Sequence, residues 1–141
     1  MKIELKQVKG NTYIGKADSN HWVPIDASLN DDGSNAGTRP MELVLIALGG
    51  CTAMDVELIL KKKHAGMQKL EMEISAERAN EHPKVFTKIH ITYIIHGNVR
   101  QADAEHAVSL SQEKYCSVSA MLKSTAEVTY DIKIVEPEKN L

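Results

Sequence analysis

Two cysteines are the residues of this chain best suited to covalent chemistry. Cys51 closes the segment Gly49-Gly50-Cys51 within an apolar stretch, and Cys116 comes much later, after Tyr115. A free cysteine is most often a small buried hydrophobe, but a thiolate is also a nucleophile and can form a disulfide. The two glycines argue against the first interpretation, because each costs a helix about 1 kcal/mol relative to alanine and lets another group approach the backbone. A partner helix or a substrate would both fit that space.

The composition is that of an ordinary small globular protein. The 141 residues are 43% hydrophobic and 26% charged, and the formal net charge of −2 offers no basic surface to nucleic acid. The sequence shows no signal peptide and no uninterrupted apolar segment of membrane length. We therefore expect a cytoplasmic protein that binds neither nucleic acid nor membrane. In a reducing cytoplasm, a cysteine pair is more often catalytic or redox-active than structural.

The N-terminal third has the pattern of strands. Residues 1–8 alternate between apolar and polar side chains, and residues 12–17 offer a hairpin partner. Residues 21–26 predict a third strand, in which Pro24 marks an edge or a bulge. Residues 27–39 are rich in Asn, Asp, Gly and Ser and predict the longest loop.

The apolar stretch that contains Cys51 predicts a long helix. Pro40 suits its first turn, where the missing N–H does no harm, and we expect the helix to run to about Ala65, with Gly66 after it. The lysines at 61–63 fit the last turn, because cations are stabilised at a helix C-terminus, and we prefer this to an anion-binding site.

The remaining elements complete an α+β fold. Residues 70–76 and 85–95 alternate as strands, residues 103–116 predict a second helix, and residues 126–135 predict a last strand. The element order is β-β-β-α-β-β-α-β, with antiparallel hairpins and two main helices. We expect one domain over residues 1–141, with a polar tail from about residue 136.

The segment Thr38–Leu43 with Gly49-Gly50-Cys51, followed by Tyr115–Ser119, resembles the OsmC/Ohr family of osmotically inducible and organic hydroperoxide resistance proteins, in a divergent, YhfA-like branch. The resemblance covers nearly the whole chain, since the predicted element order also fits. It implies an intertwined homodimer in which long central helices are surrounded by sheets from both chains.

The resemblance also implies an activity, that of a thiol-dependent peroxidase without a cofactor. Cys51 would be the peroxidatic cysteine, which attacks an organic hydroperoxide and becomes a sulfenic acid. Cys116 would resolve that acid as a disulfide, and an external dithiol would reduce the bridge. In members of this family an arginine and a glutamate assist, and Arg39 and Glu42 are the candidates for these roles.

Helix geometry separates these two candidates from the cysteine of their own chain. At 1.5 Å per residue, Arg39 lies about 17–18 Å from Cys51 along a straight helix, and Glu42 about 14 Å. In one arrangement a second copy completes the site with Arg39 of the partner subunit, which Glu42 or Asp55 orients. In the other, no cation is present and Cys51 is an inert thiol. We favour the first, because Gly49-Gly50 permits the close helix approach that it requires.

The surroundings of Cys51 predict the substrate class, and an alternative function stays open. Leu48, Gly49, Gly50 and Met54 are the candidate substrate-binding residues and suit an alkyl or lipid-like hydroperoxide. The histidines have no zinc-ligand spacing, so we expect no metal site. The alternative is a non-catalytic stress protein of the same fold that binds a small apolar ligand at the dimer interface.

Overall fold

The computed structural model describes residues 1–137 and divides into two compact units, Met1–Ile46 and Ala47–Leu141. The boundary falls inside helix α1 (Pro40–Lys62). The expectation of a single domain stays a prediction. Of the polar tail expected from residue 136, residues 138–141 lie outside the described part of the chain.

The first unit is built on a small antiparallel sheet. Strands β1 (Glu4–Lys9), β2 (Thr12–Lys16) and β3 (Val23–Ile25) pair in that order, so all three predicted strands are present and the third is shorter than expected. The ammonium groups of Lys6 and Lys16 lie 5.5 and 4.9 Å from the centroid of the Trp22 ring.

The loop that follows β3 is tied down by one buried carboxylate. Asp26 is 2% exposed, and it accepts hydrogen bonds from the Thr12 hydroxyl and from the backbone N–H groups of Ala27, Ser34 and Ala36. The 3-10 helix η1 (Leu29–Asp31) lies within this loop. The longest predicted loop therefore has a polar centre that fixes its path.

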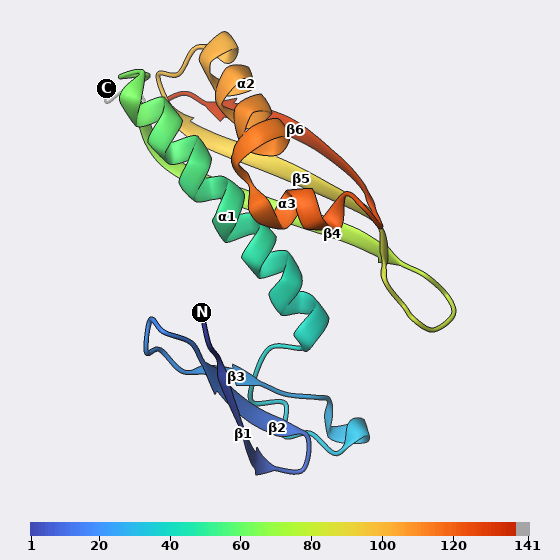
Figure 1. Cartoon of the computed structure of the whole chain (residues 1–141). Helices are drawn as coiled ribbons and strands as arrows, with labels where there is room; N and C mark the ends of the chain where they lie inside the picture. Colours follow the sequence, from blue (N-terminus) through green and yellow to red (C-terminus); the bar gives the residue numbers. More distant parts are fainter. Residues whose placement is uncertain (138–141) are drawn as a thin grey trace. The chain divides into compact units, whose positions relative to one another are not determined.

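The second unit is a three-stranded sheet with helices over one face (Figure 1). Strand β5 (Phe86–Gly97) is central, with β4 (Met67–Arg78) antiparallel to it and β6 (Glu127–Val135) parallel to it. Alternate β5 side chains are buried beneath the helices: Ile89, Ile91, Tyr93 and Ile95. The buried α1 side chains recur every fourth residue, as expected of one helix face: Leu48, Thr52, Val56 and Leu60.

The crossover between β5 and β6 differs from the single helix that the sequence predicts. It consists of α2 (Gln101–Leu110), a π-helical turn η2 (Ser111–Tyr115) and α3 (Ser117–Leu122). Cys116 has an extended backbone between the last two, at φ −73° and ψ 99°. Cys116 ends one helix and begins the next: its N–H makes the last hydrogen bond of the π-helical turn, to the Ser111 carbonyl, and its sulfur caps α3.

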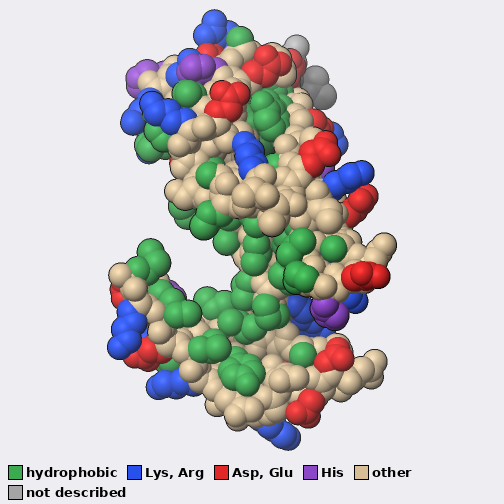
Figure 2. All heavy atoms as spheres, turned by 45° about the vertical axis from the view of Figure 1, so that its right-hand side comes forward, with side chains coloured by type: hydrophobic (Ala, Val, Ile, Leu, Met, Phe, Trp, Pro, Cys, Tyr) green, Lys and Arg blue, Asp and Glu red, His purple; other side chains and the backbone are tan. Residues whose placement is uncertain are grey.

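Helix α1 is apolar but not deeply enclosed within one chain. It is the single helix of residues 1–137 that is long and apolar enough to cross a membrane, a criterion that core helices also meet. The mean hydropathy of its most apolar window is 2.0, yet only 22% of that window is buried. Large hydrophobic side chains are exposed on both units (Figure 2), including Trp22 and Val23 on the first and Met54 and Leu58 on the second.

Candidate functional site

Helix α1 presents Cys51 and Asp55 on one face, because residues four apart in a helix project in nearly the same direction. Both side chains are half-buried. The helix begins eleven residues before Cys51, so its N-terminal dipole does not act on this sulfur. Cys51 therefore depends for its reactivity on the side chains around it.

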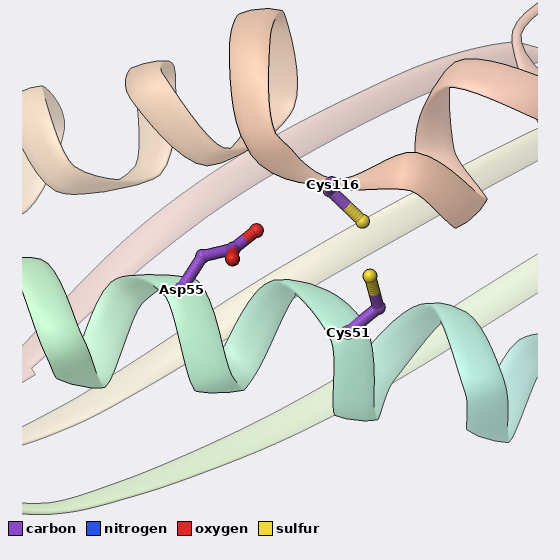
Figure 3. Close-up of side chains that lie close together, drawn as sticks. All are labelled: Cys51, Asp55 and Cys116. Carbon is purple, nitrogen blue, oxygen red and sulfur yellow. The ribbon is translucent and has the colours of Figure 1, made fainter.

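Cys116 lies near Cys51 and Asp55, although it belongs to the crossover between β5 and β6. It is 3% exposed, and its Sγ accepts a hydrogen bond from the Ser119 N–H at 3.4 Å. The two sulfurs point toward each other from α1 and from the η2–α3 junction, with Asp55 beside them (Figure 3). The two sulfurs and one Asp55 carboxylate oxygen all lie within 4.8 Å of one another.

Both cysteines are free thiols at a spacing from which a disulfide can form after a small movement. Among residues 1–137 this is the single group of three or more His, Cys, Asp or Glu side chains whose ligand atoms converge. Two facing sulfurs on separate elements are what thiol–disulfide chemistry requires. The arrangement of the group can support that chemistry.

The protonation of Cys116 follows from its setting. Burial raises the pKa of the Cys116 thiol to about 11, and the neighbouring Cys51 and Asp55 act in the same direction. Cys116 is therefore a thiol at neutral pH. The more accessible Cys51 is the better placed of the two for a first attack on a small molecule.

A buried network of polar side chains supports Asp55. The Ser111 hydroxyl donates to Asp55 Oδ2 at 2.9 Å and lies 2.7 Å from the Thr52 hydroxyl. The Thr52 hydroxyl lies 2.6 Å from the Tyr93 hydroxyl. The Gln112 amide donates to both Thr52 and Tyr93, and Ser119 donates to Gln112. No buried side-chain polar atom of residues 1–137 is left without a partner.

The sequence analysis did not identify the residues of this network, although one of them has a recognisable sequence signal. Thr52 occupies a core position of an apolar helix, four residues after Leu48 and four before Val56. A hydroxyl at such a position needs a buried partner, so it predicts a polar network. The partners Tyr93 and Ser111 could not be found from spacing, because they come from other elements.

The candidate substrate-binding residues have four different environments. Leu48 is fully buried in the core and Met54 is 73% exposed. A methyl group on Gly49 would lie 3.2 Å from Ile74 on β4, whereas one on Gly50 would meet nothing within 4 Å. The close approach at Gly49 is therefore made by the chain's own sheet, and the space beside Gly50 is open.

Arg39 and Glu42 belong to the first unit and form the start of α1. The Arg39 N–H donates to Glu42 Oε2 at 2.9 Å, and the Arg39 guanidinium donates to the Gly37 carbonyl at 3.1 Å. The first of these bonds satisfies a backbone donor that the helix leaves free at its N-terminus. These bonds give both residues a structural role at the helix start.

A pocket of about 370 Å³ opens beside Asp55 in the second unit. Its walls are mainly apolar side chains, with two lysines about two helical turns further along α1. The residues that line it include Asp55, Leu58, Lys62, Lys63, Leu110 and Tyr115. The pocket can take a small ligand with an apolar body.

The class of protein follows from its match to a family profile. The sequence profile of the OsmC-like proteins matches residues 32–131, and the chain belongs to this family. It is 37% identical to Protein YhfA of Escherichia coli (strain K12) over 136 residues, which are 96% of this chain and 98% of that protein. The predicted family is thus confirmed.

Solved structures confirm the α+β fold. A hypothetical protein from Aquifex aeolicus VF5 is 32% identical and superposes with a TM-score of 0.81 over 95% of this chain and 96% of its own. The organic hydroperoxide resistance protein OhrB of Bacillus subtilis is 18% identical, with a TM-score of 0.63 over 94% of this chain and 96% of its own. The second likeness establishes a common fold and nothing more.

Proposed function

We propose that this chain is a thiol-dependent peroxidase that reduces organic hydroperoxides through Cys51 and Cys116. The observation that carries the proposal is the facing pair of free sulfurs, held within 4.8 Å on two different elements. Membership of the OsmC-like family supports it, since a structural neighbour is named as an organic hydroperoxide resistance protein.

The cycle has three steps. The Cys51 thiolate attacks the terminal oxygen of the hydroperoxide, the O–O bond breaks, and the alkoxide takes a proton to leave as an alcohol. Cys51 is then a sulfenic acid. The Cys116 sulfur attacks the Cys51 sulfur, the S–O bond breaks, and the hydroxide leaves as water with the Cys116 proton. An external dithiol supplies two electrons and two protons to restore both thiols.

The chain would act as a homodimer in the cytoplasm. Helix α1 leaves apolar side chains exposed in the single chain, and burying them against a second copy would stabilise both. The open space beside Gly50 lets another helix come close. Arg39 of the partner subunit, oriented by Glu42, is the proposed cation for the Cys51 thiolate.

The first test is oxidation of the reduced protein with one equivalent of cumene hydroperoxide. We expect the alcohol to form stoichiometrically and intact-mass spectrometry to find one intramolecular disulfide. A Cys51→Ser variant should consume no hydroperoxide, and a Cys116→Ser variant should stop at a sulfenic acid that dimedone traps. If the wild type keeps both thiols, or if Cys51→Ser is equally active, the peroxidase proposal fails.

A second candidate function is the binding of a small apolar ligand without catalysis. The pocket beside Asp55 is the observation that favours it. A binding protein would show a ligand-dependent rise in melting temperature that persists when both cysteines are replaced by serine. A peroxidase would instead lose all turnover in that double variant.

A further inference from the structure

Asp55 is close to both reacting sulfurs, but it has no role in the three steps of the proposed cycle. One of its carboxylate oxygens lies within 4.8 Å of each sulfur, and its side chain projects from the same face of α1 as Cys51 (Figure 3). The position follows from the four-residue spacing within a regular helix. Any movement that brings the sulfurs together takes place beside this carboxylate.

The resolving step needs a proton acceptor. With a pKa of about 11, only about one Cys116 thiol in ten thousand is ionised at pH 7. A thiolate attacks sulfur and a thiol does not. Fast formation of the disulfide therefore requires a base near Cys116 that removes its proton as the S–S bond forms.

The polar network points its hydrogen bonds toward Asp55. The Ser111 hydroxyl donates its one hydrogen to Asp55 Oδ2. In the bond between Ser111 and Thr52, Thr52 must therefore be the donor. Because Thr52 has no second hydrogen, Tyr93 must donate to Thr52. Burial raises the pKa of Tyr93 to about 12, which keeps this donor protonated. The chain of donors ends on Asp55, which is thereby held as an acceptor.

The second oxygen of Asp55 stays available. Oδ2 is held by Ser111, whereas Oδ1 accepts no hydrogen bond from any other residue in the part of the chain that the structure describes. A carboxylate fixed through one oxygen and open at the other is well placed to receive a proton.

We propose that Asp55 accepts the Cys116 proton during the resolving step and passes it to the leaving hydroxide. The Cys116 sulfur forms the S–S bond with Cys51, the S–O bond of the sulfenic acid breaks, and the hydroxide takes the proton from Asp55 and leaves as water. The carboxylate is then regenerated. This role rests on the proposed function, because it belongs to the second step of that cycle.

The pH dependence of this step depends on the ionisable groups around Asp55. Cys51 lies on the same helix and Cys116 on the crossover, while Tyr93 on β5 is linked to Asp55 through Thr52 and Ser111. Lys62, Lys63 and Tyr115 share its pocket, and the Lys63 ammonium lies 3.4 Å from an Asp103 carboxylate oxygen.

Ellman's reagent (a disulfide whose released thiol is yellow) isolates this step from hydroperoxide chemistry. One equivalent, with a chelator present, first releases one yellow thiol as Cys51 forms a mixed disulfide. Attack by Cys116 then releases the second, which gives two phases in a stopped-flow trace. The second leaving group needs no proton, so the loss of the Cys116 proton is the single proton transfer in this phase.

We expect Asp55→Asn to keep the first phase and to slow the second by about tenfold to a hundredfold at pH 7. The slow phase of Asp55→Asn should accelerate steadily toward alkaline pH, because Cys116 must then ionise unaided. The wild-type rate should be flat across the neutral range. Asp55→Glu should recover part of the rate, and Glu57→Gln, an exposed carboxylate on the same helix, should change nothing.

The direction in which Asp55→Asn changes the second-phase rate distinguishes a proton acceptor from a purely electrostatic influence. The Asp55 charge raises the pKa of Cys116, so removing a purely electrostatic influence would speed the second phase. A second phase in Asp55→Asn as fast as in the wild type, or faster, would overturn the proposal, as would a wild type with no second phase. If these phases behave as expected but hydroperoxide is not consumed, the peroxidase function is wrong and the Asp55 role in thiol exchange stands.

Discussion

At the scale of single residues, the two cysteines differ in their exposure to solvent. Cys51 is half-buried and Cys116 is almost fully buried. The sequence was sufficient to single out both, because cysteines are rare in it and Gly49-Gly50 is unusual in a helix. It was not sufficient to place Cys116 at a helix junction beside Asp55, since that depends on contacts between distant segments.

The raised pKa of Cys116 predicts a loss of stability in alkali. The unfolded thiol ionises near pH 9, whereas the folded thiol stays protonated up to about pH 11, so the unfolded state binds fewer protons between these values. The free energy of unfolding should therefore fall as pH rises through this range, by no more than about 2–3 kcal/mol. Urea unfolding of the reduced protein from pH 8 to pH 10 measures this slope, and Cys116→Ala should flatten it. Parallel curves for the two proteins would contradict the assignment.

At the scale of elements, hydrophobic periodicity predicted the long helix and the strands, because burial on one face imposes that period. It did not predict η2, α3 or the parallel pairing of β6 with β5. The π-helical turn brings Gln112 over Thr52 and Tyr93, and hydrogen bonds of this kind leave no periodic trace in a sequence.

Thr52 joins α1 to both β5 and the crossover, so its hydroxyl should matter to stability. Thr52→Val keeps the shape but leaves the buried hydroxyls of Tyr93 and Ser111 short of a partner. We expect a loss of about 2–4 kcal/mol in the free energy of unfolding, measured with urea under reducing conditions. Thr87→Val, at an exposed position near the start of β5, should cost less than about 0.5 kcal/mol. Equal losses would show that the network contributes nothing beyond an ordinary surface bond.

At the scale of the whole molecule, the sequence was sufficient to predict the family and the α+β class, because the motif around Cys51 and the order of the elements agree. The homodimer stays a prediction, and so does the single domain. The apolar content of α1 suggested a central helix, yet a pattern along one chain cannot say whether the cover comes from the same chain or from another copy.

The proposed dimer can be tested on the exposed face of α1. Gly50, Met54 and Leu58 follow one another at intervals of four residues, and all three are exposed in the single chain. We expect analytical ultracentrifugation to find that the wild type is a dimer. Met54→Asp should raise the dissociation constant of the dimer at least tenfold. Gln101→Asp adds the same charge at the exposed start of α2 and should leave the dimer intact. A dimer untouched by Met54→Asp would place the interface elsewhere.

The position of the chain's single tryptophan has a practical consequence. Trp22 belongs to the Met1–Ile46 unit, and two ammonium groups lie near its ring. Its fluorescence therefore reports the melting of that unit, while the ellipticity of α2 and α3 follows the other. Comparing the two optical transitions in one sample reveals whether the two units unfold in a single transition or one after the other.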